Sequence, residues 1–258
     1  MDRILLNKIK EEVLSIPLEP KSKNNDFTGV YLHSNSPFKL EDHLGPIHSF
    51  NVFSKYEYPI EFFISPESIN KDFEVLLEKY PNITPTLIPK LESIIDFNYF
   101  SIYELPHRIR GENLLYFQED SSFIKHGFEK LCHDYDWIGA PWAERLKVDE
   151  NVFNFDWVQV GNGGICFRRR SKCLEVLKLV EKYGGQDKIV KGLIIEGKHR
   201  TYNSFLAEDA FFCYFGFGSG IFKSISTEIA KQFSLEPITY KQFKEKRSFA
   251  FHRVDSYE

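Results

Sequence analysis

The chain has 258 residues, with 33 basic and 37 acidic side chains and a formal net charge of −4 at pH 7. Hydrophobic residues make up 42% of it and aromatic residues 16%, enough for the core of one large domain. No excess of positive charge marks a nucleic-acid or anionic-membrane partner. We therefore expect partners of another chemical class.

The first twenty residues, MDRILLNKIKEEVLSIPLEP, are charged every few positions and lack the continuous apolar segment of a secretion signal. No stretch is apolar for long enough to span a bilayer. The four cysteines are scattered, without a Cys-x-x-Cys pair. These features predict a cytoplasmic protein with reduced thiols and no membrane span.

Short apolar runs alternate with helical patterns along the chain, which indicates an α/β sandwich with a mainly parallel sheet. We predict strands at 28–35, 60–65, 114–117, 136–141 and 164–169. Helices are predicted at 71–80 and at 171–183, the second with Ser171 as its N-cap. The segment 184–203, rich in glycine and charge, is predicted to be a loop.

The segment LLYFQEDSSF places three polar residues directly after an apolar strand. Ligands of open α/β sheets bind beyond the carboxyl ends of the strands, so Gln118, Glu119 and Asp120 are expected at a crevice. Strand alternation predicts that Gln118 and Asp120 face one side and Glu119 the other. Such oxygens suit Mg²⁺ or Mn²⁺ bound together with phosphates. An ordinary turn, with Asp120 capping the next segment through a following serine, explains the same residues.

A cluster of glycines, VGNGGICFRRR, precedes the strand predicted at 164–169. Gly161, Gly163 and Gly164 permit backbone conformations closed to other residues and allow a ligand to approach the main chain. A dinucleotide-binding loop fits poorly, because such a loop follows a strand and opens a helix. A glycine turn between two strands is the alternative.

Glu208 and Asp209 open an aromatic, helical segment, AEDAFFCYF. Carboxylates in a first turn are favoured by the helix dipole, which is sufficient to explain them. The functional alternative is a catalytic base held at a helix start above the crevice. The sequence leaves both interpretations open.

The segments LLYFQED, YDWIGAPW, VGNGGICFRRR, EDAFF and FAFH occur in this order over about residues 90–252. Together they resemble a widespread domain of unknown function that looks like a GT-A glycosyltransferase family, distantly similar to inverting galactosyltransferases. The joint order is far more specific than any single motif. The resemblance implies one GT-A-like domain over 1–258, with a helical segment at 1–25, a nucleotide-binding half at 27–110, and a metal, acceptor and catalytic half at 111–258.

The resemblance also implies roles for residues at the matching positions. A divalent ion, Mn²⁺ or Mg²⁺, would be held by Asp120 and His252, because Gln118 replaces the first aspartate of the family's metal motif. Asp209 would be the catalytic base, and Glu208 would contact a sugar. Donor binding would fall to Gln118, Glu119 and His33, and substrate binding to Trp142, Asn162, Gly163 and Gly164.

The implied reaction is hexosyl transfer from a nucleotide-diphosphate sugar, expected to be a UDP-sugar, to a hydroxyl of a glycan or other acceptor, with inversion. A sugar nucleotidyltransferase is one alternative, although a basic, glycine-rich triphosphate loop is absent near the first strand. A catalytically weak glycan-binding module is the other, kept open by Gln118. His252 is equally explained as a surface histidine in a polar tail. Trp137, Trp142 and Trp157 either form walls for sugar rings or pack in the core.

Overall fold

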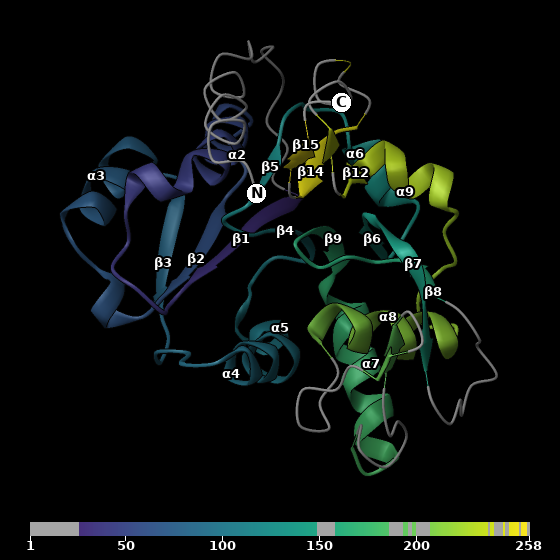
Figure 1. The fold of residues 1–258 in the computed structure, drawn as a ribbon. Helices are drawn as coiled ribbons and strands as arrows, with labels where there is room; N and C mark the ends of the chain where they lie inside the picture. Colours follow the sequence, from purple (N-terminus) through teal and green to yellow (C-terminus); the bar gives the residue numbers. More distant parts are fainter. Residues whose placement is uncertain are drawn as a thin grey trace.

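The computed structural model describes residues 26–148, 158–185, 193–195, 198–199, 207–236, 238–239, 245, 248–252 and 254–256. Its central sheet has six strands in the order β3-β2-β1-β4-β9-β6 (Figure 1). The strands are β1 (Phe27–His33), β2 (Ile60–Ile64), β3 (Ile83–Leu87), β4 (Asn113–Phe117), β6 (Trp137–Gly139) and β9 (Ile165–Arg169). Only β9 runs against its neighbours. The predicted α/β class with a mainly parallel sheet is confirmed.

Helices cover both faces of this sheet (Figure 1). They are α2 (Leu44–Lys55), α3 (Lys71–Lys79), α4 (Ile94–Tyr99), α5 (Leu105–Arg108), α6 (Glu129–His133), α7 (Arg170–Lys182), α8 (Glu208–Gly218) and α9 (Thr227–Phe233). Short helical turns are η1 (Leu40–His43), η2 (Pro66–Ser68) and the π-helical η3 (Phe100–Glu104). Within the ranges described above, every helix is too short or too polar to cross a membrane.

The central strands are buried on both faces, and their side chains alternate between two apolar cores. In β4, Leu114 and Tyr116 pack in the core that contains α7 and α8 residues. Leu115 and Phe117 pack in the opposite core, with residues of α2, α3 and α9. A strand buried on both sides has an apolar residue at nearly every position, which is why LLYF predicts one.

Three smaller sheets flank the central one. Strands β12 (Ser234–Leu235), β14 (Ala250–His252) and β5 (Ser121–Phe123) form the first, in that order. The second contains β11 (Lys198–His199), β10 (Leu193–Ile195), β7 (Pro141–Val148) and β8 (Val158–Val160), and the third pairs β13 (Ile238–Thr239) with β15 (Val254–Ser256). The first sheet brings the end of the described chain back to the end of β4.

The start of α7 differs from the prediction. The helix begins at Arg170, and Ser171 lies within its first turn rather than at the N-cap. The backbone N–H of Ser171 donates to both carboxylate oxygens of Glu112, at 3.3 and 3.2 Å. A negative side chain just before β4 therefore satisfies the helix start, as the helix dipole favours. The N-cap prediction is wrong because the group that accepts this N–H, the carboxylate of Glu112, lies far from the helix in the sequence.

The predicted loop at 184–203 is wrong in part. Strands β10 and β11 form an antiparallel hairpin inside it, and β10 also pairs with β7. Most of the remaining segment lies outside the described residues. The apolar run Leu-Ile-Ile at 193–195 is a strand signal, but the surrounding glycine and charge obscured it.

A substitution at Phe117 tests how much the core beneath the crevice contributes to stability. Phe117 is fully buried, with the rings of Tyr31, Phe53 and Phe123 at centroid distances of 5.1, 5.5 and 6.2 Å. We expect Phe117→Ala to lower the free energy of unfolding by about 3–5 kcal/mol, because a large cavity remains. Leu87→Ala, at a position 59% exposed, is the control and should change it by about 0.5 kcal/mol or less. Equal effects in urea titrations would contradict this placement of Phe117.

Candidate active site

Residues 118–120 form a tight turn between β4 and β5 rather than an extension of the strand. The backbone N–H of Ser121 donates to the Gln118 carbonyl at 3.2 Å, and the Ser121 hydroxyl accepts the Gln118 N–H at 2.8 Å. The predicted alternation is therefore wrong, because it applies only to extended chain. Gln118 and Glu119 both line one cavity, whereas Asp120 faces His252.

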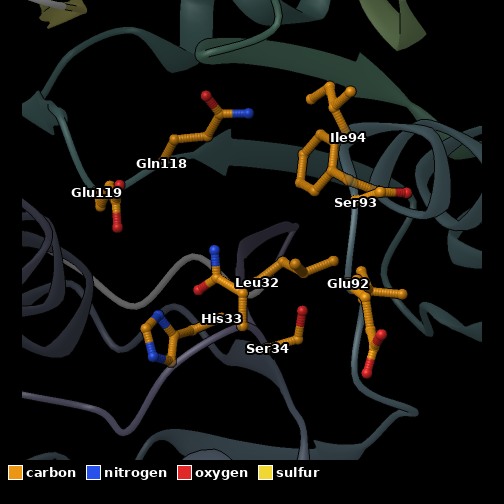
Figure 2. A pocket seen from close by; sticks show the side chains of 11 residues that line it. Leu32, His33, Ser34, Glu92, Ser93, Ile94, Gln118 and Glu119 are labelled. Carbon is orange, nitrogen blue, oxygen red and sulfur yellow. The ribbon is translucent and has the colours of Figure 1, made fainter.

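The cavity has a volume of about 410 Å³ and lies at the carboxyl ends of β1 and β4 (Figure 2). The chain passes from β1 to β2 on one side, while β4 lies on the other, so this is the topological switch point where such sheets bind ligands. The cavity brings together the three predicted donor-binding residues, His33, Gln118 and Glu119. Its other lining residues are Leu32, Ser34, Asn35, Leu91, Glu92, Ser93, Ile94 and Phe97.

Asp120, His252 and Glu236 form a row of carboxylate, imidazole and carboxylate. The antiparallel pairing of β5 with β14 sets His252 opposite Ser121, beside Asp120. The parallel pairing of β12 with β14 sets Leu235 opposite Phe251, which brings Glu236 to the same ring. His252 Nε2 lies 3.0 Å from Asp120 Oδ1, and Nδ1 lies 3.1 Å from Glu236 Oε1.

This row determines the charge of His252. Burial alone lowers the pKa of the imidazole, but the carboxylates of Asp120 and Glu236 outweigh burial and raise the pKa to about 9. A separation of 3.0 Å also suits two neighbouring ligands of one ion at metal–ligand distances of about 2.1 Å. A carboxylate on the far nitrogen of a metal-ligating histidine orients the ring. Asp120 and His252 thus fit the predicted divalent ion, and Glu236 was missed by the sequence analysis.

The glycine loop between β8 and β9 fits closely against the other site residues. A Cβ on Gly164 would lie 2.3 Å from the His252 ring, and one on Gly163 would lie 2.7 Å from a carboxylate oxygen of Glu208. Asn162 Oδ1 accepts the N–H of Gly164 at 2.8 Å and so holds the loop. Space, rather than backbone conformation, requires glycine at 163 and 164. Gly161 has a φ of +143°, so there the conformation also requires it.

Asp209 lies in the first turn of α8 and is partly exposed. Its Oδ2 accepts the N–H of Gly163 at 3.1 Å, and its Oδ1 accepts the N–H of Ala210 at 2.7 Å. Burial raises its pKa above the ordinary value despite these hydrogen bonds. A carboxylate held at both oxygens and made more basic has the properties of a general base.

Glu208, the preceding residue, has a different environment. It is 4% exposed and forms a buried ion pair with Arg168, whose guanidinium lies over the rings of Tyr116 and Trp137 at 4.3 and 4.4 Å. Burial raises the pKa of Glu208 to about 7, although the positive charge of Arg168 lowers it. The Asn98 side chain accepts the backbone N–H of Glu208 at 3.1 Å. Neither Arg168 nor Asn98 was singled out from the sequence.

The sequence left two interpretations of the tryptophans open, sugar walls and core packing. Trp137 is fully buried and stacks on Phe212 and Phe222, so it is a core residue. Trp142 is partly buried against the same core and is not among the residues that line the cavity. Trp157 lies outside the described residues.

Residues 102–252 match the model of a family described as "Protein of unknown function (DUF5672)". A search of the curated proteins finds no match.

Several solved structures are similar to the chain at low identity. The apo form of the glycosyltransferase GlyE from Streptococcus pneumoniae TIGR4 is 11% identical, with a TM-score of 0.44 over 90% of this chain and 55% of that one. The mannosyltransferase Ktr4p from S. cerevisiae is 11% identical, with a TM-score of 0.36 over 70% and 55%. S. aureus TarS 1-349 is 11% identical, with a TM-score of 0.37 over 58% and 48%. The chain thus spans about half the length of these structures.

The buried ion pair gives a prediction about stability. We expect Arg168→Met to lower the free energy of unfolding by about 3–5 kcal/mol, because it leaves the Glu208 charge buried without its partner. Adding Glu208→Gln should recover part of this loss. Arg108→Met is the control, because Arg108 pairs with Glu104 at the surface and such pairs contribute about 1 kcal/mol or less. Equal losses in the two arginine variants in denaturant titrations would contradict a buried pair.

The raised pKa of His252 predicts how stability depends on pH. Below pH 6.5 the imidazole is protonated in both the folded and the unfolded chain, so the carboxylates stabilise the fold fully. As pH rises from 6.5 through about 9, this contribution, at most about 3.5 kcal/mol at about 1.4 kcal/mol per pKa unit, is lost. Urea unfolding with EDTA should show the decline, and His252→Gln should remove it. His107→Gln, at an exposed position, should retain it; an unchanged slope in His252→Gln would refute the pairing.

Proposed function

This chain belongs to the family described as "Protein of unknown function (DUF5672)", and we propose that it is a metal-dependent glycosyltransferase. It would transfer a hexose from a nucleotide-diphosphate sugar, with UDP as the nucleotide, to an acceptor hydroxyl with inversion. One observation carries the proposal: the glycine loop at 161–164 contacts both Asp209 and His252 and hydrogen-bonds to Gln118 at the cavity. The whole chain, 1–258, would be one GT-A-like domain with 27–110 as its nucleotide-binding half.

The cavity at the switch point is the proposed donor site. Leu91, Ile94 and Phe97 give it an apolar wall for a flat base, and Ser93 and Gln118 supply polar atoms beside that wall. A volume of about 410 Å³ lies in the range typical of small-molecule sites.

The diphosphate would lie near Asp120 and His252, which fit a divalent ion, Mn²⁺ in the first instance. Such an ion supplies positive charge that stabilises the leaving diphosphate. Glu236 holds the His252 ring in place through Nδ1. Because Asp120 directly follows Glu119 in the turn, the ion site adjoins the donor cavity.

Asp209 is the proposed base. Its carboxylate takes the proton of the acceptor hydroxyl while that oxygen bonds to the anomeric carbon and the bond from this carbon to the diphosphate breaks. Attack from the face opposite the leaving group gives inversion. Glu208 is assigned a positioning role instead of a sugar contact, because it is buried against Arg168. Asn162, Gly163 and Gly164 would shape the sugar site, and Trp142 would lie at its edge.

The alternatives are less well supported. A nucleotidyltransferase needs cationic groups for a triphosphate, but the described residues that line the cavity include Glu92 and Glu119 and no lysine or arginine. A glycan-binding module without catalysis gives no reason for a carboxylate with a raised pKa beside the loop.

Two substitutions separate the metal site from the base. We expect Asp120→Ala to abolish Mn²⁺-dependent UDP binding in calorimetry, because a direct ligand is lost. Asp209→Asn should retain that binding, since the amide is nearly isosteric and the phosphates are held elsewhere. Transfer, or slow donor hydrolysis in a screen of nucleotide sugars, should fall by about 10²- to 10⁴-fold in Asp209→Asn.

The outcomes distinguish the parts of the proposal. Asp134→Ala is a matched control on the exposed surface after α6 and should change neither quantity. UDP binding that is unaffected in Asp120→Ala would remove the metal assignment. Near wild-type transfer in Asp209→Asn would remove the base, and sugar binding without any nucleotide binding would favour the glycan-binding module.

A further inference from the structure

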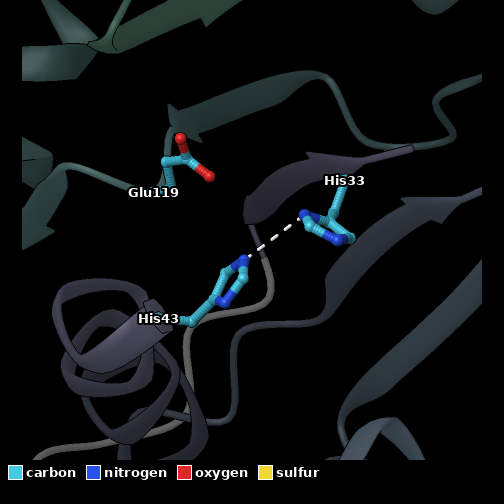
Figure 3. A group of neighbouring side chains, drawn as sticks. All are labelled: His33, His43 and Glu119. Atoms are coloured by element: carbon cyan, nitrogen blue, oxygen red, sulfur yellow. Dashed lines mark hydrogen bonds between the residues drawn. The ribbon is translucent and has the colours of Figure 1, made fainter. Parts of the chain in front are cut away.

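Three potential metal ligands converge at the wall of the cavity: His33, His43 and Glu119 (Figure 3). They come from the end of β1, the end of η1 and the turn after β4. One ligand atom from each lies within 4.8 Å of the other two. His33 and His43 are 5% and 1% exposed, whereas Glu119 is exposed.

Backbone carbonyls fix the tautomers of the two histidines. His33 Nε2 lies 2.8 Å from the carbonyl oxygen of Ser36, and His43 Nδ1 lies 2.7 Å from that of Lys39. A carbonyl oxygen only accepts hydrogen bonds, so both of these ring nitrogens carry a hydrogen. In two neutral rings the other nitrogens, His33 Nδ1 and His43 Nε2, therefore present lone pairs.

These two nitrogens face each other at 3.3 Å (Figure 3). Two lone pairs at this distance repel unless a proton or a metal cation lies between them. Two nitrogens bound tetrahedrally to one ion at about 2.0–2.1 Å are about 3.3 Å apart. Metal-ligating histidines also usually donate their other N–H to a carbonyl or carboxylate, as both rings do here.

The donor set indicates which cations fit. Two imidazole nitrogens and one carboxylate oxygen suit Zn²⁺ and related transition metals, whereas Mg²⁺ prefers oxygen ligands. Burial lowers the pKa of His33, which favours its neutral, metal-binding form. His33 and Glu119 also line the cavity, so an ion here would face its interior.

We propose that His33, His43 and Glu119 bind a divalent transition-metal ion of the zinc class, with a fourth coordination position open to the cavity. This site is distinct from Asp120 and His252 and does not depend on the proposed transferase activity. The open position would take an oxyanion, such as a phosphate or carboxylate group, of a molecule in the cavity.

Cobalt(II) is a probe that reports the site directly, because tetrahedral Co²⁺ absorbs visible light much more strongly than octahedral Co²⁺. We expect the full chain, stripped with EDTA and titrated with Co²⁺, to develop a tetrahedral spectrum that Zn²⁺ bleaches at one equivalent. His43→Ala should lower Co²⁺ affinity by more than about 100-fold, exceeding the loss of an outer-shell partner. Glu119→Gln, at an exposed position, should also weaken binding without endangering the fold.

Two further variants make the result specific. His48 is a buried histidine in α2 that does not belong to the cluster, so His48→Gln should keep the cobalt spectrum. His252→Ala removes the proposed donor-metal ligand and should also keep it, while losing Mn²⁺-dependent UDP binding. Far-ultraviolet circular dichroism verifies that each variant is folded.

If the wild-type chain gives no tetrahedral cobalt spectrum, the proposed metal site is wrong. A proton shared between the two rings would then explain their short separation. Retention of the spectrum in both His43→Ala and Glu119→Gln would overturn the site as well. Loss in His252→Ala but not in His43→Ala would assign the ion to the other site. Because the cobalt measurement needs no nucleotide, its failure and that of the transferase proposal are distinguishable.

Discussion

A buried ion pair, between Arg168 of β9 and Glu208 of α8, connects the central sheet to the helix that carries Asp209. The rings of Tyr116 and Trp137 pack on the guanidinium. Removal of either charge would leave the other desolvated, so the pair strongly restricts how α8 lies on the sheet. The position of Asp209 follows from this restriction, and Gly163 adds a hydrogen bond to its carboxylate.

The second constraint on the crevice is that two residues of the loop, Gly163 and Gly164, have no side chain. Gly164 leaves the space that the His252 ring fills, and Gly163 leaves the space beside Glu208. The two glycines are consecutive, so one loop sets the separation between β14 and the start of α8. A larger residue at 164 would clash with the His252 ring, and one at 163 would clash with Glu208. The loop thus acts as a spacer.

The sequence predicted the α/β class because strands buried on both faces, such as LLYF, are continuous apolar runs. Such a run can be recognised without knowing its partners in the sheet. It also selected segments that meet at the crevice. Only the family resemblance implied that Asp120 and His252 lie together. The residue pattern did not, because their approach depends on a turn and on the register between β5 and β14, where the paired Ser121 and His252 are 131 residues apart. His43 gave no signal, because its partner His33 is identified only after η1 folds against β1. For Trp137 the sequence left sugar binding and core packing open, because its position beside a motif does not show whether the side chain is buried; the structure places it in the core.

The row of Asp120, His252 and Glu236 also implies an order of events. With the imidazole protonated, the three side chains together carry one net negative charge, which repels a diphosphate. A divalent ion that displaced this proton would bring the sum to zero. An anionic donor would then approach without that repulsion, so in the proposed reaction the cation enters first and the donor second. Each such entry would release a proton to the solvent, which makes the arrival of the ion visible as acidification of a weakly buffered solution.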